Sequence, residues 1–449
     1  MASILIGNVY TEQLAGDPLL LSPHQRLVAC ALSQRMLWFA QDGDIVVLPR
    51  QPGAAYMAYI ATLADFDPTT VTIIVPPAGY AGDVILTGDR LTHPSFVEEL
   101  RRETAHRDIH RILPYFTDTA TADMARSAGI SSALPGAHFF SQGGGSIANS
   151  KALFRCVAAG IGIPIAAGET AQTRDSADRA IAGLIGAGHS VIVKQEHQAS
   201  SEGNLILSPR PNTQAQGALS VTHIDAVADI EKFLDDHWNW LSNNDTSTVI
   251  IERYIEHARS VYAEYLVTDY TIGAVGTGQL LMAPILAGVV IPAGCLTPTE
   301  QADVSDAALR LCKAYQAMGY RGIMSVDAVV SPDGDVYVHE TNSRISGATY
   351  LHKVFTAHIA GSDRVLIDRE RWEVSSFDGA LRALTDSGLT FDFATRRGII
   401  ITADSTWIDG TVRYVLVGVD LDDAYQLEAQ LHALSAGPTL EEAPVAATH

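Results

Sequence analysis

The sequence predicts a protein of mixed α/β and α+β class built from two or three units, and three observations support this. Residues 1–140 alternate short apolar runs with amphipathic segments, a rhythm typical of helices packed on a parallel sheet. Three consecutive glycines then interrupt the pattern, and a smaller set of strands and helices begins near residue 375. With 449 residues, the chain is long enough to bury a cleft between such units.

The first unit is expected to open with a strand over residues 4–7, followed by a helix over 24–40. Further apolar and amphipathic runs predict strands at 45–48, 72–75 and 111–115 and a helix at 95–103. No G-x-G-x-x-G pattern follows the first strand, so the unit is Rossmann-like without the glycine pattern of a dinucleotide site.

The segment Ser141–Ser146 is expected to link the first unit to the second. Its three glycines would lose much conformational entropy in a helix or strand, so a hinge is predicted and the first domain is placed at 1–145. A loop that cradles phosphate remains the alternative, although no G-K-[ST] follows.

The second unit, over 146–372, is expected to hold a hairpin whose turn is Pro332-Asp333-Gly334, and a long helix that begins at the capping sequence Thr297–Glu300. Helices are predicted at 149–162, 173–187, 222–241, 298–318 and 347–361, and strands at 190–194, 205–207, 248–252, 261–268, 322–330 and 335–340. The uncharged segment 271–299 is broken by prolines and glycines, which favours strands over a membrane-spanning helix.

The third unit, over 373–449, is expected to be a small α+β domain. Its predicted elements are helices at 377–387 and 421–435 and strands at 398–402 and 412–419, and the tail 443–449 is expected to be disordered.

Composition excludes several classes of function. The chain has 30 Lys and Arg against 51 Asp and Glu, a formal net charge of −21, which argues against nucleic acid as a partner. The four cysteines lie far apart without a C-x-x-C pair, so buried thiols are expected rather than a zinc site or disulfides. The N-terminal segment lacks the basic region of a secretory signal, so a cytoplasmic location is expected.

Three oxygen-bearing side chains point to chemistry. Asp327 interrupts an apolar predicted strand, and Glu340 and Asn342 stand two residues apart, on one face of the next strand. Two carboxylates and an amide oxygen suit Mg²⁺, whose other ligands would be water and nucleotide phosphates. Taken singly, each carboxylate is as well explained by an ion pair or by solvent, but the three in this register predict a magnesium–nucleotide site.

Lys194 ends an apolar predicted strand and precedes a loop that contains Ser200, Ser201 and Gly203. A cation and main-chain N–H groups so arranged can surround phosphate oxygens, so the loop is predicted to be a lid; an exposed, uncommitted lysine is the alternative. The segment Ile250–Ile255 is expected to run from a strand into a crossover whose main chain recognises an adenine edge.

Together these segments resemble the ATP-grasp superfamily. The resemblance rests on four motifs in the family's order over residues 146–350: Lys151 opening a helix that ends in Gly162-Ile163-Pro164, the Val191–Lys194 strand with its lid, the hinge Glu252–Ile255, and the D-x12-E-x-N set Asp327, Glu340 and Asn342. It implies an ATP-grasp fold with an N-terminal Rossmann-like pre-ATP-grasp domain and a small C-terminal α+β domain.

The resemblance also implies roles for individual residues. Lys151 and Lys194 would contact the nucleotide phosphates under the lid of Ser200, Ser201 and Gly203; the hinge of Glu252, Arg253, Tyr254 and Ile255 would hold adenine through the main chain at Arg253 and Ile255; Asp327, Glu340 and Asn342 would hold one or two Mg²⁺ ions. Lys194 and Arg344 would be the catalytic residues. Arg344 and Ser346 would contact the substrate. A guanidinium suits a carboxylate or a developing oxyanion, while a surface position is the alternative for Arg344.

Two departures from the family pattern stand out. Arg259 occupies the place of a glutamate that binds ribose in many relatives, which leaves Glu256 or Glu264 as substitutes. Ser325 replaces an arginine that D-alanine ligases carry two residues before the metal-binding aspartate, so the oxyanion role would pass to Arg344 or Arg321 and a D-alanine substrate is not expected.

The layout is also similar to peptide ligases of the pheganomycin type in natural-product biosynthesis. That implies ATP and Mg²⁺, the carboxylate of an N-capping nonproteinogenic amino acid activated as an acyl phosphate, and a peptide amine as acceptor, with release of ADP and phosphate. It leaves a homodimer open. Two alternatives remain: a biotin-carboxylase-like enzyme that makes carboxyphosphate, and a non-catalytic nucleotide-binding protein.

Overall fold

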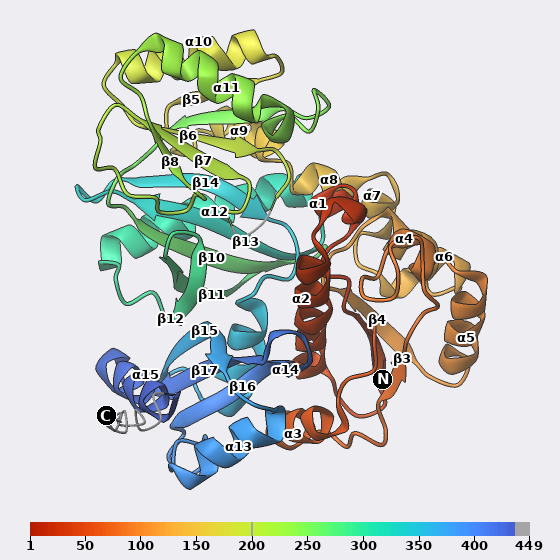
Figure 1. Ribbon diagram of the computed structural model, residues 1–449. Helices are drawn as coiled ribbons and strands as arrows, with labels where there is room; N and C mark the ends of the chain where they lie inside the picture. The colour runs from red at the N-terminus through yellow and green to blue at the C-terminus, as the bar shows by residue number, and fades with distance from the viewer. Residues whose placement is uncertain (199–200, 436–449) are drawn as a thin grey trace, which may run out of the picture.

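A computed structural model describes residues 1–198 and 201–435. In this part of the chain the strands form sheets of four, five and eight strands, and the helices lie against them (Figure 1). Two predictions fall on other residues: Ser200 of the lid and the C-terminal tail lie outside the described residues.

The four-stranded sheet belongs to the N-terminal unit and has the order β3-β2-β1-β4. Each neighbouring pair is parallel, as the alternating pattern predicted. The strands are β1 (Ala2–Ile6), β2 (Ile45–Val47), β3 (Thr72–Ile74) and β4 (Ile109–Pro114). The main helices are α2 (Pro23–Ser33), α3 (Ala54–Ala64), α5 (Pro94–Thr104) and α6 (Thr119–Ser127). The helix predicted over 24–40 continues beyond α2 as the 3₁₀ segment η2 (Gln34–Phe39).

The five-stranded sheet, at the top of Figure 1, has the order β5-β9-β6-β7-β8 and its own apolar core. Its strands are β5 (Gly168–Ala171), β6 (Val191–Gln195), β7 (Asn204–Ser208), β8 (Val221–His223) and β9 (Val249–Arg253), covered by α10 (Arg174–Gly186) and α11 (Val227–Leu241). The helix predicted from residue 222 begins only at Val227, because the residues before it pair with β7 as β8.

The eight-stranded sheet is antiparallel and has the order β14-β13-β10-β11-β12-β15-β17-β16. Its strands are β10 (Arg259–Val267), β11 (Ile272–Met282), β12 (Leu286–Ile291), β13 (Gly322–Val330), β14 (Val336–Asn342), β15 (Val365–Glu373), β16 (Gly398–Ser405) and β17 (Thr411–Gly418). The associated helices are α12 (Pro298–Met318), η4 (Leu351–Ile359), α13 (Phe377–Asp386) and α15 (Leu421–Ser435). The uncharged segment thus supplies two strands, as predicted.

The predicted boundary at 372/373 falls within this sheet. Strand β15 pairs with β12 on one side and with β17 on the other, so main-chain hydrogen bonding continues from the central unit into the C-terminal one. The C-terminal elements extend the central sheet and do not form a sheet of their own.

The prediction that glycines keep residues 141–146 from forming a helix is wrong. Gly144 and Gly145 begin the short helix α8 (Gly144–Ala148), directly after α7 (Ala137–Ser141). A Cβ on Gly144 would lie 2.3 Å from the Phe139 ring, and one on Gly145 would lie 2.3 Å from the Thr117 carbonyl oxygen. These glycines therefore allow close packing.

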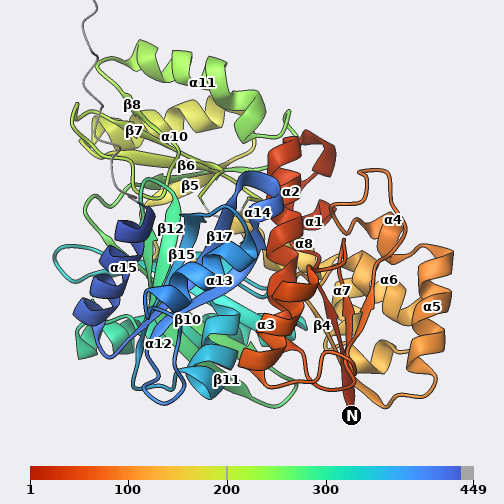
Figure 2. The ribbon, with the colours of Figure 1, turned by 60° about the horizontal axis from the view of Figure 1, so that its bottom comes forward.

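The N-terminal unit also packs on the C-terminal strands. The indole Nε1 of Trp38 and the hydroxyl of Tyr56 both donate to the main-chain oxygen of Thr402 on β16, at 3.1 and 2.6 Å. Figure 2 shows α2 and α3 beside these elements, and one apolar core runs through both units. The domain bounds remain predictions, but the units share buried surface.

No helix within the described residues is both long and apolar enough to cross a membrane. The cysteines differ from the expectation of buried thiols: Cys30 and Cys312 are buried, whereas Cys156 is exposed and Cys295 is intermediate.

Candidate functional site

The predicted metal triad lies on two paired strands of the eight-stranded sheet. Asp327 of β13 is directly opposite Glu340 of β14, and Ser325 is opposite Asn342. The Asn342 amide donates to Asp327 Oδ2 at 2.9 Å, and the Ser325 hydroxyl donates to Asp327 Oδ1 at 3.0 Å. The three residues chosen from spacing alone are therefore brought together.

A β-bulge creates this arrangement. The pairing shifts between Asp327↔Glu340 and Ala328↔Val338, so His339 is an extra residue on β14. Such a residue lets Val338 point to the core, where it is 1% exposed, while Glu340 lies on the same face as Asp327. The sequence carried no signal for this bulge.

Electrostatics at the triad follow from burial and from the neighbouring lysine. Burial, and next the charge of Glu340, raise the pKa of Asp327 to about 7. Burial opposes ionisation of Glu340 as well, but Lys151, whose Nζ lies 3.0 Å from Glu340 Oε1, keeps the pKa of Glu340 below its ordinary value. The two opposed carboxylates form an acidic pair that a cation can neutralise.

The donor set fits a hard divalent cation. It offers two carboxylates and one amide, an oxygen-only set of the kind that Mg²⁺ accepts when other ligands complete its shell. Asn342 would have to turn its amide oxygen toward the cation, because its nitrogen now faces Asp327. Among the described residues, no group of three or more His, Cys, Asp or Glu is placed to hold a metal, and the triad contains only two carboxylates.

The two predicted phosphate-binding lysines are buried and paired. Lys194 is 4% exposed, and its Nζ lies 2.5 Å from Glu252 Oε2, while Arg155 binds the other oxygen of the same carboxylate. This excludes the alternative that Lys194 is an exposed, uncommitted lysine. Burial opposes ionisation, but Lys194 and Arg155 keep the pKa of Glu252 below its ordinary value. The Glu252 side chain is thus engaged within the protein.

Arg344 lies in the same cavity as the triad, not on the open surface. Its Nη1 donates to Asn149 Oδ1 at 2.6 Å, and the same oxygen accepts from the Ser343 N–H at 3.0 Å. Asn149 in turn donates to the Gly145 carbonyl oxygen at 2.9 Å. The predicted linker therefore positions Arg344 through Asn149.

A cavity of about 170 Å³ lies where the three parts of the chain meet. Its polar lining comes from all of them: Tyr10, Arg35 and Tyr115 from the N-terminal unit, Ser325, Asp327, Glu340, Asn342, Arg344 and Ser346 from the centre, and Glu370 and Arg413 from β15 and β17. We call it the junction cavity. Substrate could reach the triad and Arg344 in this one space.

Comparisons with known proteins agree with this architecture. The family model of the pre ATP-grasp domain matches residues 33–130, and that of the PGM1 C-terminal domain matches residues 379–431. The structure resembles an N5-carboxyaminoimidazole ribonucleotide synthetase in its ADP complex, with a TM-score of 0.57 and 12% identity over 97% of each chain. It also resembles biotin carboxylase from Campylobacter jejuni, with a TM-score of 0.55 and 13% identity over 94% of this chain and 89% of that one.

The chain has the ATP-grasp fold. At these identities the structural likeness shows the fold alone. A curated relative, the [butirosin acyl-carrier protein]–L-glutamate ligase of Niallia circulans, is 26% identical over 118 residues. The match covers 25% of this chain and 28% of that protein.

The loop predicted to be a lid is described except for residues 199 and 200. Ser201 has a left-handed backbone (φ 65°), and the Gly203 carbonyl accepts from the Gln195 N–H at 2.9 Å. A Cβ on Gly203 would lie 2.7 Å from Gln198 Cβ, so a side chain there would collide with the loop. Lys151 Nζ donates to the Gln198 carbonyl at 2.9 Å. Because Lys151 is also paired with Glu340, it connects the predicted lid to the metal triad.

The segment predicted to bind adenine has part of its main chain already engaged in hydrogen bonds. The N–H groups of Arg253 and Tyr254 donate to the carbonyls of Ala167 and Ser190, at 2.7 and 2.8 Å. The Arg253 N–H is therefore engaged, and the prediction rests on the remaining main-chain groups up to Ile255. Tyr254 and Glu256 line an adjoining cavity of about 490 Å³.

The residues considered for contact with ribose lie in different surroundings. Arg259 is tied to Glu300 at 2.5 Å. Glu264 is fully buried and accepts from the hydroxyls of Ser346 and Thr349, both at 2.8 Å. Glu256 lies at the hinge cavity, where Arg210 binds it at 2.8 Å, so it is the better placed of the two glutamates.

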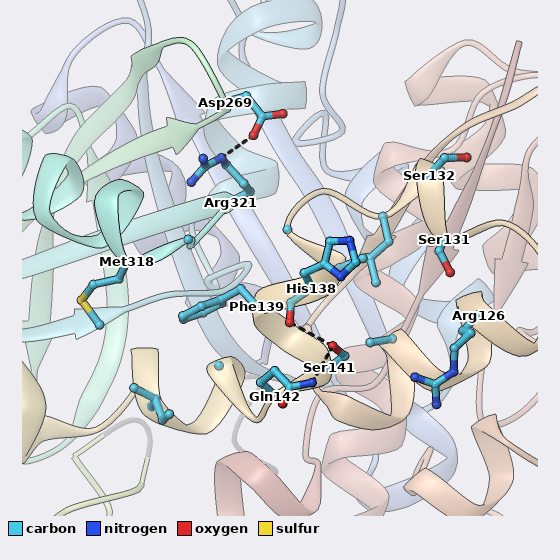
Figure 3. A pocket seen from close by; sticks show the side chains of 17 residues that line it. Arg126, Ser131, Ser132, His138, Phe139, Ser141, Gln142, Asp269, Met318 and Arg321 are labelled. Carbon is cyan, nitrogen blue, oxygen red and sulfur yellow. Dashed lines mark hydrogen bonds and ion pairs between the residues drawn. The ribbon is translucent and has the colours of Figure 1, made fainter.

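Arg321, the other residue considered for an oxyanion, lies elsewhere. It pairs with Asp269 at 2.7 Å and lines a cavity of about 850 Å³ between the turn after β10 and helices α7 and α8 (Figure 3). Its wall contains none of the triad residues. Of the two arginines, only Arg344 lies in the junction cavity.

Several cavity residues were missed by the sequence analysis. Tyr10, Arg35, Glu370 and Arg413 belong to no motif and come from distant segments of the chain. The one local signal among these four was Arg35, a cation directly before the apolar run Met36–Trp38, which is buried.

Proposed function

We propose that this protein is an ATP-dependent carboxylate–amine ligase that forms ADP. The observation that carries the proposal is the junction cavity, which the paired residues Asp327 and Glu340 line together with Arg344. Anionic reactants need a divalent cation and a fixed guanidinium nearby, and the cavity supplies residues for both.

ATP and Mg²⁺ are the proposed co-substrate and cofactor. Asp327, Glu340 and Asn342 would hold the metal, which when bound would neutralise charge on the transferring phosphoryl group. Lys151 and Lys194 would add positive charge at the phosphates, and their burial fixes their position at little further entropic cost.

Arg344 would hold the substrate carboxylate, or the oxyanion that develops on it when the amine attacks. Asn149 binds one nitrogen of its guanidinium, so the group is already oriented before substrate enters. Ser346, which lines the cavity, has its hydroxyl directed to Glu264 and would contact substrate through its remaining acceptor capacity.

In more detail, we propose a peptide ligase that activates an amino-acid-like carboxylate as an acyl phosphate and joins it to the amino group of a peptide, in natural-product biosynthesis. The resemblance to pheganomycin-type ligases and the match to the PGM1 C-terminal domain support it. The buried cavity suits the chemistry, because an acyl phosphate must be kept from water.

The test is a screen of the purified protein with ATP, Mg²⁺ and mixtures of carboxylic acids and peptides, reading phosphate release and product mass together. We expect release of phosphate only with an acid and an amine present, and a product mass equal to the sum of both minus water. Turnover that requires bicarbonate would point instead to a carboxylase, and no ADP with any pair would leave only nucleotide binding.

A further inference from the structure

Arg35 is a buried cation that the proposed mechanism does not use. It lies on η2 of the N-terminal unit, its side chain is 7% exposed, and it lines the junction cavity together with the metal triad. The guanidinium carbon lies 5.2 Å from the centre of the Tyr350 ring.

The guanidinium has donors without acceptors. Within the part of the chain that the structure describes, neither Nε nor Nη2 of Arg35 makes a hydrogen bond, although both atoms are buried. The nearest acid is Asp368, whose Oδ2 is 3.7 Å from Nη2 and whose Oδ1 accepts from the Tyr350 hydroxyl at 2.9 Å. Asp368 offsets the charge but leaves the N–H groups unsatisfied, which buried donors rarely are.

Arg90 shows what a structural arginine looks like in this protein. It is 1% exposed, and its Nε, Nη1 and Nη2 all donate to main-chain carbonyls, at 2.7 to 3.2 Å. Arg90 is satisfied by the protein alone. Arg35 is also buried, at 6% exposed, but it borders a cavity.

The wall near Arg35 has little else to neutralise it. Glu370 lines the same cavity but is bound by Arg413 at 2.9 Å. Gly347 adjoins Arg35, and a Cβ there would make an ordinary van der Waals contact with Nη1 at 3.5 Å, so the glycine leaves Nη1 less covered than a residue with a side chain would. A planar fork of free donors is suited to a carboxylate, which can accept two parallel N–H bonds.

We propose that Arg35 binds a carboxylate group of the substrate in the junction cavity, as a specificity-determining residue contributed by the N-terminal unit. The inference rests on the proposed ligase function for the identity of the substrate. The anion site itself can be tested without turnover.

The binding test follows the thermal unfolding midpoint in sodium acetate, in sodium chloride of equal ionic strength and in acetamide, the neutral isostere. We expect acetate alone to raise the midpoint of the native protein. The shift should be lost in Arg35→Met, partly kept in Arg35→Lys, and unchanged in Arg371→Met, which removes an exposed arginine outside the cavity. An equal acetate shift in Arg35→Met and native protein, or none in the native protein, would overturn the proposal.

Removing Arg35 leaves Asp368 as a buried carboxylate, so the single variant could unfold. The pair Arg35→Met with Asp368→Asn removes both charges and then carries the same test. Should the double variant still respond to acetate as the native protein does, Arg35 is only a structural partner of Asp368.

Turnover separates this inference from the proposed function. With an active acid and amine pair, Arg35→Met should raise the KM for the acid about tenfold or more and change the KM for ATP less than about twofold. If the native protein shows the Arg35-dependent acetate shift but no acid and amine pair forms ADP, the ligase function falls and the anion site stands.

Discussion

At the scale of single residues, Glu340 decides whether the triad is a metal site. Replacing it by Ala removes one of the two opposed carboxylates and leaves Lys151 without its acidic partner. We expect ADP formation to fall about 100-fold or more, because the lost carboxylate would hold the metal that neutralises charge on the transferring phosphoryl group. Glu373→Ala, an exposed glutamate on β15, is the matched control. Substantial ADP-forming turnover in the Glu340 variant would refute the metal assignment.

Lys194 is expected to act on nucleotide affinity. Lys194→Ala should weaken equilibrium nucleotide binding about tenfold or more, since it removes the buried cation that we propose contacts the phosphates. The control is Lys232→Ala, because Lys232 forms an exposed pair with Asp236 on α11. Unchanged affinity in Lys194→Ala, measured by calorimetry, would show that this lysine only neutralises Glu252.

Glu264 gives a prediction for pH dependence. Burial raises the pKa of Glu264 to about 7, from about 4.5 in the unfolded chain. Between these two pH values the unfolded chain releases a proton that the folded chain retains. The folded state is therefore penalised increasingly as pH rises from about 4.5 to 7, and the penalty is constant above that. Its Oε1 accepts from Ser346 and Thr349, an acceptor role that an amide oxygen can keep.

Glu264→Gln should therefore change the free energy of unfolding more favourably at pH 8 than at pH 5. The changes at the two pH values should differ by an amount on the order of 3 kcal/mol. Urea unfolding of both proteins at the two pH values measures this. Glu373→Gln, an exposed change, should show no such difference. The same effect of Glu264→Gln at both pH values would contradict the raised pKa.

Site residues could be predicted from the sequence where they belong to a motif within one short segment of the chain. Asp327, Glu340 and Asn342 were found because strand pairing converts sequence spacing into proximity. Arg35 and Glu370 reach the cavity only through packing between units, which no pattern in one sequence encodes.

At the scale of elements, helix α8 tests the role of the glycines. Gly145→Ala would place a Cβ 2.3 Å from the Thr117 carbonyl and disturb the segment that holds Asn149. We expect a loss of stability of about 1–3 kcal/mol and a lower rate of ligation. Gly160→Ala, where nothing lies within 4 Å, should be neutral or slightly stabilising. If Gly145→Ala is tolerated like Gly160→Ala, the segment is a flexible hinge after all.

Elements were predictable where periodicity and capping agree. Helix α12 begins at Pro298 with the Thr297–Glu300 capping box in place, and the parallel strands of the first unit match their apolar runs. Strand β8 was taken for the start of a helix because its partner β7 lies in another segment. Composition alone misjudged α8, since close packing favours the glycines that propensity disfavours there.

At the scale of the whole molecule, the shared core predicts that the N-terminal and C-terminal units unfold together. Trp38 is 1% exposed, packs on Phe355 with ring centres 4.8 Å apart, and donates to Thr402 on β16. Trp38→Ala should lower the free energy of unfolding by about 3–5 kcal/mol, through lost apolar contact and the loss of one of the two hydrogen bonds that the Thr402 carbonyl accepts.

The decisive measurement is hydrogen exchange at the amides of β16. Cooperative unfolding means that Trp38→Ala, a change in the N-terminal unit, reduces the protection of these C-terminal amides by an amount close to the global loss of stability. Trp240→Ala, a half-exposed residue on α11 in the unit with its own core, should leave β16 protection unchanged. Unaltered protection of β16 in Trp38→Ala would mean that the units unfold independently, and that the junction cavity can open without unfolding either one.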